Sequence, residues 1–168
     1  MLYLGLIICL ISAGFFAYGR ICAIKARCDE YSAVCALLLH IRGKLASGGG
    51  ALCEILRDFR SDRLEGNGTL RLLGRGDAAA AFLNGEPLFR DKLSLSHLLC
   101  DKGDSEKLSE YFSLFGKSYI DEERKKLDGI IGYFEKRTAS VTEKGEKDIK
   151  VTMVLFAFFS VGAFILIM

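Results

Sequence analysis

The first residues of the chain, MLYLGLIICLISAGFFAYG (Met1–Gly19), contain no Asp, Glu, Lys, Arg or His. The last residues, VTMVLFAFFSVGAFILIM (Val151–Met168), lack the same five residue types. At about 1.5 Å of rise per residue, each stretch makes a helix of about 27–28 Å, close to the roughly 30 Å hydrocarbon thickness of a bilayer. The sequence therefore predicts a transmembrane helix at 1–19, a second at 151–168, and one soluble domain, 20–150, between them.

The N-terminal stretch does not have the pattern of a cleaved signal peptide. No Lys or Arg precedes its apolar run, and the run is longer than the usual hydrophobic region of such a peptide. We therefore expect both stretches to remain in the protein as permanent anchors in membrane lipid.

All 23 Lys and Arg residues and all 21 Asp and Glu residues of the chain lie in the segment 20–150. Such a composition is typical of one soluble domain with a single core. The net charge of +2 is balanced, and the sequence has no basic cluster interleaved with aromatic residues. Nucleic acid is therefore not an expected partner.

Basic residues lie on the inner side of both apolar stretches, and none lies on the outer side. Because Lys and Arg near the ends of a span favour the cytoplasmic side, we expect the central domain to be cytoplasmic at a cell membrane. Cysteines without a tight pairing pattern agree with a reducing compartment. The basic residues are Arg20, Lys25, Arg27, Lys136, Arg137, Lys144, Lys147 and Lys150.

The central segment shows the spacing of amphipathic helices and no strand-like alternation. The predicted fold class is all-α, a helical bundle between the N-terminal and C-terminal transmembrane helices. Four groups of apolar residues at helical spacing form the expected core. They are Tyr31, Val34, Leu38, Ile41 and Leu45; Leu52, Ile55, Leu56 and Phe59; Leu108, Tyr111, Phe112, Phe115 and Tyr119; and Leu127, Ile130, Ile131 and Phe134.

Local signals predict where helices begin and end. The first helix is expected to continue beyond the membrane and to end before Gly48–Gly50, because three glycines disfavour a helix. Residues 61–77 are rich in Gly and charge and are expected to form loops around a small apolar segment. Glu86-Pro87 is expected to begin a helix. A turn at 101–104 should precede a helix capped by Asp104 or Ser105. The segment after Phe134 is expected to be a polar, helical stalk that continues into the second span.

Few residues suggest chemistry. The two histidines, His40 and His97, are not spaced with Cys or carboxylates as metal ligands are. Cys22, Cys28 and Cys35 are six and seven residues apart on one expected helix, which allows two interpretations. They form a thiol redox site, or they fill a packing face as small apolar residues, and the second is favoured. We predict no enzymatic activity, no metal, no cofactor and no small-molecule substrate.

The order of several segments along the chain is also informative. These are the initial span, LLLHIRGKL (Leu37–Leu45), ALCEIL (Ala51–Leu56), LSEYFSLFG (Leu108–Gly116) running into Asp121, and the final span. Together they resemble the stage III sporulation protein AB family over nearly the whole chain. The chain differs from the expected pattern at two turns, where it has Gly48–Gly50 and Phe115-Gly116.

The resemblance implies a structural subunit of the channel that joins mother cell and forespore in endospore-forming bacteria, located in the mother-cell membrane. It also implies a soluble domain similar to the type II secretion F domain of platform proteins, which couple a cytosolic ATPase to a membrane assembly. The implied partners are other stage III sporulation channel proteins, above all the AAA-type ATPase, stage III sporulation protein AA. The alternatives are a platform subunit of another type II secretion or type IV pilus-like system, and the thiol redox protein.

Charged residues on the soluble helices are the candidate contacts with such a partner. The plainer interpretation of each is a solvated helix face. The candidates are Glu54, Arg57, Asp121 and Arg124.

Overall fold

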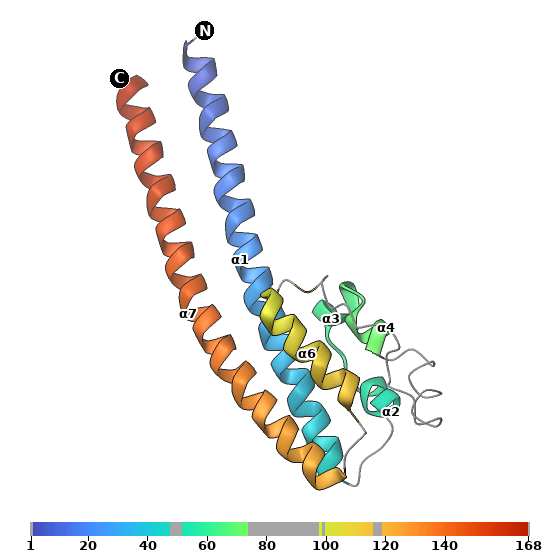
Figure 1. Cartoon of the computed structure of the whole chain (residues 1–168). Helices are drawn as coiled ribbons and strands as arrows, with labels where there is room; N and C mark the ends of the chain where they lie inside the picture. The colour runs from blue at the N-terminus through green and yellow to red at the C-terminus, as the bar shows by residue number, and fades with distance from the viewer. Residues whose placement is uncertain (1, 48–51, 74–97, 99, 116–118, 168) are drawn as a thin grey trace. The chain divides into compact units, whose positions relative to one another are not determined.

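The computed structural model describes residues 2–47, 52–73, 98, 100–115 and 119–167. In these ranges the secondary structure is helical, without strands, so the predicted all-α class is confirmed (Figure 1). The helices are α1 (Leu2–Ala46), α2 (Leu52–Arg57), α3 (Asp62–Gly66), α4 (Thr69–Leu73), α6 (Lys102–Leu114) and α7 (Ile120–Ile167).

The chain separates into two compact units. Unit 1 consists of Met1–Cys28 and Ala139–Met168, and unit 2 consists of Asp29–Thr138. Helices α1 and α7 contribute to both units, because each is one continuous helix, of 45 and 48 residues respectively. The prediction that the first helix continues beyond its apolar part is confirmed, and so is the helical stalk after Phe134.

Unit 1 contains the apolar ends of α1 and α7. Both helices are long and apolar enough to cross a membrane. Large apolar side chains cover their surfaces, an arrangement suited to lipid rather than to water. On α1 the exposed ones include Ile7, Ile8, Ile11, Phe15 and Phe16, and on α7 they include Leu155, Phe158, Phe159, Phe164 and Ile165.

Small residues bring the two helices of unit 1 into contact. A Cβ atom on Gly145 of α7 would lie 2.9 Å from the Cys28 sulfur and 3.1 Å from the Ile24 methyl carbon on α1. A Cβ atom on Gly14 would lie 3.6 Å from the Phe156 ring, which is an ordinary contact. Only a residue without a side chain therefore fits at position 145 without movement of its neighbours.

The core of unit 2 is formed by the apolar faces of α1, α6 and α7. All five residues predicted for the α1 face are buried, together with Leu37. On α6, at its C-cap and on α7, the predicted faces are buried at Leu108, Tyr111, Phe112, Phe115, Leu127, Ile131 and Phe134. Each fully buried Leu, Ile or Phe side chain stabilises the fold by about 1.5–3 kcal/mol. Two residues predicted for the α6 and α7 faces are not buried, since Tyr119 is 86% exposed and Ile130 is only partly buried.

Polar contacts attach the short helices to α1. The ring nitrogen Nε2 of His40 lies 3.1 Å from the carbonyl of Ile55 on α2. The amide of Asn67, which follows α3, donates a hydrogen bond of 2.7 Å to Glu30. Ile55, Leu56, Leu64 and Leu73 bury their side chains from α2, α3 and α4.

Two local predictions are wrong. Loops around a small apolar segment were expected at 61–77, but α3 and α4 occupy most of 61–73, and 74–77 lie outside the described residues. Ser61 caps α3 by accepting a hydrogen bond from the Leu64 amide, and Gly68 supplies a positive φ of 78° for the turn to α4. Helix α6 begins at Lys102 with Asp101 as its N-cap, not at Asp104 or Ser105. The helix predicted at Glu86-Pro87 lies outside the described residues, as does Gly48–Gly50.

Candidate functional site

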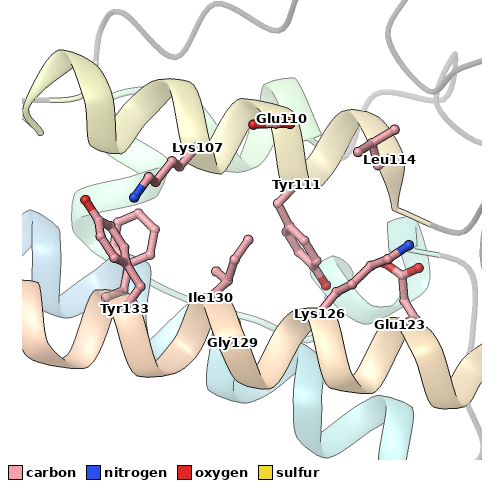
Figure 2. Close-up of a pocket in the computed structure, with 10 residues that line it drawn as sticks. Lys107, Glu110, Tyr111, Leu114, Glu123, Lys126, Gly129, Ile130 and Tyr133 are labelled. Atoms are coloured by element: carbon pink, nitrogen blue, oxygen red, sulfur yellow. The ribbon is translucent and has the colours of Figure 1, made fainter.

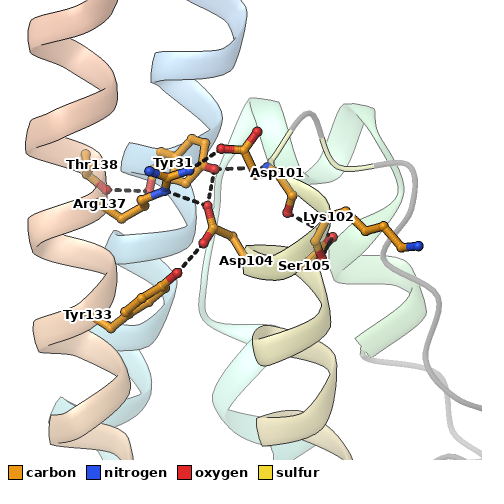
Figure 3. Close-up of polar contacts among 8 residues, drawn as sticks. All are labelled: Tyr31, Asp101, Lys102, Asp104, Ser105, Tyr133, Arg137 and Thr138. Atoms are coloured by element: carbon orange, nitrogen blue, oxygen red, sulfur yellow. Dashed lines mark hydrogen bonds and ion pairs between the residues drawn. The ribbon is translucent and has the colours of Figure 1, made fainter.

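A buried carboxylate, Asp104, lies in the first turn of α6 and joins three helices of unit 2. It accepts a hydrogen bond of 2.5 Å from the Tyr31 hydroxyl of α1 and one of 2.8 Å from Nε of Arg137 on α7. The hydroxyl of Tyr133, also on α7, donates to its other oxygen. Figure 3 shows Tyr31, Tyr133 and Arg137 each joined to Asp104 by a dashed line.

A second carboxylate extends the cluster. The guanidinium of Arg137 pairs with Asp101, so that one arginine holds both acids. The backbone amide of Asp101 donates to the Tyr31 hydroxyl over 3.0 Å. The carboxylate of Asp101 makes no capping hydrogen bond to α6, in keeping with its use in the pair with Arg137.

The pKa values of the cluster are shifted away from neutrality. Burial alone would raise the pKa of Asp104, but hydrogen bonds from Tyr133, Tyr31 and Arg137 outweigh it and lower the pKa. Burial, together with the bond to Asp104, raises the pKa of Tyr31 to about 12. The bond to Asp104 also raises the pKa of Tyr133 and Arg137. These shifts keep Asp104 and Arg137 charged and both tyrosines protonated near pH 7, so the hydrogen bonds that join α1, α6 and α7 persist there. This cluster is called here the Asp104 clamp.

A cavity of about 470 Å³ lies between α6 and α7, next to this clamp, and is called here the α6–α7 groove (Figure 2). Its size falls in the range of ligand-binding pockets. Its apolar lining comes mainly from aromatic and aliphatic side chains, while two lysines and two glutamates supply the charges. The lining residues are Lys107, Glu110, Tyr111, Leu114, Glu123, Lys126, Gly129, Ile130, Tyr133 and Phe134.

Tyr111 gives this groove its most unusual feature. The side chain points from α6 toward α7 and is only 5% exposed (Figure 2). Among the residues that the structure describes, its buried hydroxyl has no hydrogen-bond partner. Burial and the charge of Glu123 raise its pKa, so the hydroxyl keeps its proton. A buried hydroxyl without a partner costs about 1–3 kcal/mol, which a bound group with a hydrogen-bonding atom would recover.

The structure does not bring the four predicted contact residues together in one site. Glu54 and Arg57 are exposed on α2, and Asp121 is exposed in the first turn of α7. Arg124 is half-buried, and its guanidinium donates a hydrogen bond of 2.8 Å to the carbonyl of Leu45 in the last turn of α1. Arg124 therefore has a structural function at the end of a helix, where carbonyl groups lack helical partners.

The three cysteines of the proposed redox alternative lie on α1 and are not placed to form a disulfide with one another. In the described part of the chain, no disulfide joins Cys9, Cys22, Cys28, Cys35 or Cys100. Because α1 is continuous, Cys22, Cys28 and Cys35 are separated by about 9 and 10.5 Å along its axis, too far for a disulfide. Burial and the charge of Glu135 raise the pKa of Cys35, which disfavours the reactive thiolate. Among the described residues, no group of His, Cys, Asp and Glu is placed to hold a metal ion.

Sequence reasoning missed both the clamp and the groove. It assigned Asp104 to a helix cap and Arg137 to the basic residues near the second span. One signal was available, because Tyr133 and Arg137 are four residues apart and so share a face of α7. The partner residues Tyr31 and Asp104 are too distant in sequence for any spacing rule to find.

The fold and the site define a class, that of helical-bundle proteins with two helices able to cross a membrane. The same two helices contribute to unit 2, which contains the Asp104 clamp and the α6–α7 groove. Comparisons with protein-family models, with curated proteins and with solved structures give no match.

Proposed function

We propose that this protein is a membrane-anchored structural subunit of the channel between mother cell and forespore. In this proposal unit 2 lies in the cytoplasm, where it couples a AAA-type ATPase, stage III sporulation protein AA, to the membrane assembly. The sequence resemblance supplies the biological setting, and the protein itself has no enzymatic activity.

The continuity of α1 and α7 is the observation that carries the proposal. Each helix combines an apolar segment long enough to span a bilayer with a buried face of the unit 2 core. Each of α1 and α7 is one continuous helix, so the chain passes between unit 2 and unit 1 without an intervening loop. The Asp104 clamp holds α1, α6 and α7 together and thereby favours transmission of load over local rearrangement.

Exposed charges on α2 are the most accessible contacts for the ATPase. Glu54 and Arg57 are both exposed, and Asp121 offers a further negative charge on α7. Complementary charges of this kind steer association and fix the register of an interface.

Cells of an endospore former test the proposal. Full-length protein should resist extraction by alkaline carbonate, its deletion should block spore formation, and it should co-purify with stage III sporulation protein AA from detergent. Charge reversal at Glu54 and Arg57 should weaken that co-purification, whereas Lys125→Glu, an exposed change on α7, should not. Release by carbonate, or normal spore formation without the protein, would contradict the proposed function. Unchanged co-purification of the charge-reversed protein would refute the α2 contact alone.

A further inference from the structure

The α6–α7 groove has features that point to a particular occupant. Its apolar walls and the unpartnered hydroxyl of Tyr111 call for a group that is largely apolar and carries one hydrogen-bonding atom. Its charged lining consists of two lysines and two glutamates, which gives no net charge. Phosphate-like anions and pure hydrocarbons therefore match the groove poorly, whereas a tyrosine side chain matches both requirements.

A tyrosine of that kind is exposed beside the groove. Of the large apolar side chains that are exposed in the described part of unit 2, Leu114, Tyr119 and Ile120 lie where α6 ends and α7 begins, and only Leu39 lies elsewhere. Leu114 lines the groove itself. The Tyr119 carbonyl accepts a hydrogen bond of 2.9 Å from the amide of Glu123, another lining residue, so Tyr119 lies one helical turn from the groove.

We propose that Tyr119 of a second copy of this chain fills the α6–α7 groove, in a two-fold symmetric dimer. The phenol ring covers the apolar wall at Ile130 and Phe134, and its oxygen accepts a hydrogen bond from Tyr111. Tyr119 and the groove lie at the same pair of helices, so a two-fold axis lets each copy insert its Tyr119 into the groove of the other. This dimer goes beyond the proposed channel function and does not depend on it.

Charge and composition support a second copy as the occupant. A two-fold axis can place the exposed Lys107 of one copy near the exposed Glu110 of the other, and the balanced lining avoids repulsion between identical surfaces. Tyrosine is enriched in the centres of interfaces because it combines a large apolar ring with a polar tip.

Gly129 provides a clean way to block the groove. It lines the groove, and a Cβ atom at this position would meet no atom within 4 Å. A leucine there should occupy the space that the partner's Tyr119 would use, without disturbing the helix. Gly103 is a matched control, because it is also exposed, also has open space around its Cβ position, and does not line the groove.

The test uses the full chain in detergent. Sedimentation velocity over a range of protein concentrations should show a reversible dimer for the wild type, Gly103→Leu and Leu39→Ala. Tyr119→Ala and Gly129→Leu should weaken it at least about tenfold, as expected for a central interface residue. Tyr119→Phe should weaken it less, because the ring remains and only the bond to Tyr111 is lost. Circular dichroism checks that each variant is folded.

A photo-cross-linking benzoylphenylalanine at position 119 provides an independent measurement that needs no destabilising change. It should attach to Tyr111, Ile130 or Phe134 of another copy, identified by mass spectrometry of mixed light and heavy isotope-labelled chains. A monomeric wild type would overturn the proposal. So would a dimer that persists in both Tyr119→Ala and Gly129→Leu, or a cross-link confined to a different protein.

Discussion

Replacing Asp104 by Ala should destabilise unit 2 by about 3 kcal/mol. Breaking a buried ion pair by removal of one partner costs about 3–5 kcal/mol. The lower part of that range applies because Arg137 is 36% exposed and keeps its pair with Asp101, so its charge remains solvated. The loss also includes the acceptor for the buried Tyr31 hydroxyl, worth about 1–3 kcal/mol. These contributions overlap and do not add in full.

Asp101→Ala is the matched control for this prediction. Both aspartates pair with the same guanidinium, but the Asp101 side chain is 45% exposed and that of Asp104 is 4% exposed. An exposed pair contributes at most about 1 kcal/mol. Urea unfolding of the full chain in detergent micelles, followed by near-ultraviolet circular dichroism of the tyrosines, measures both changes. The chain has no Trp, so Tyr31, Tyr111 and Tyr133 report on unit 2.

The difference between the two variants decides whether the clamp reasoning holds. If Asp104→Ala and Asp101→Ala lower the free energy of unfolding equally, burial does not govern the strength of these bonds. If Asp104→Ala costs less than about 1 kcal/mol, the carboxylate does not hold α6 to α1 and α7 as described.

Three further contacts yield predictions. The pKa of Tyr31 is raised to about 12 from an ordinary 10.0, so the protonated hydroxyl stabilises the folded state. This stabilisation should be complete below pH 10 and should be lost as the pH rises toward 12, which urea unfolding at alkaline pH measures. Gly145→Ala should lower the melting temperature in micelles by a few degrees, because the new Cβ would lie 2.9 Å from the Cys28 sulfur and 3.1 Å from an Ile24 methyl carbon. Cys28→Ala should restore part of the loss, because it removes the closer of the two contacts. Arg124→Gln should cost about 1 kcal/mol and accelerate hydrogen exchange in the last turn of α1, since it removes the bond to Leu45.

Each of these predictions has a control that could contradict it. Tyr31→Phe should make the alkaline loss of stability shallower, and an unchanged profile would show that Tyr31 does not contribute to it. A melting temperature raised by Gly145→Ala would mean that the helices of unit 1 do not approach closely there, because only the gain in helix propensity would then remain. Lys125→Gln should leave hydrogen exchange in α1 unchanged, in contrast to Arg124→Gln.

Local periodicity was sufficient to predict most of the fold. The buried face of α1 from Tyr31 to Leu45 follows from helical spacing alone, because each residue's direction is set by its neighbours in the same helix. The same rule failed at Tyr119, which continues the spacing from Phe115. Helix α6 stops at Leu114, so spacing no longer places residue 119 on the buried face.

The candidate site could not be predicted in this way, because its parts are distant in sequence. An acid before a helix indicates a cap by local rules, and those rules assigned Asp104 to a cap. Its real partners, Tyr31, Tyr133 and Arg137, come from two other helices. The exposed positions of Glu54 and Arg57 agree with a surface role, while contact with the ATPase stays a prediction.

The clamp also has a consequence for the order of folding. The hydroxyl of Thr138 bonds to the Tyr31 carbonyl, 107 positions earlier, and Tyr31 bonds to Asp104 across 73 positions. Closing loops of this length costs entropy before any contact compensates for it, so this bundle should fold more slowly than helical proteins with mainly local contacts. During synthesis, the apolar face of α1 cannot be covered by the rest of the bundle until Arg137 has left the ribosome. Until then the nascent chain exposes an apolar surface that chaperones can recognise.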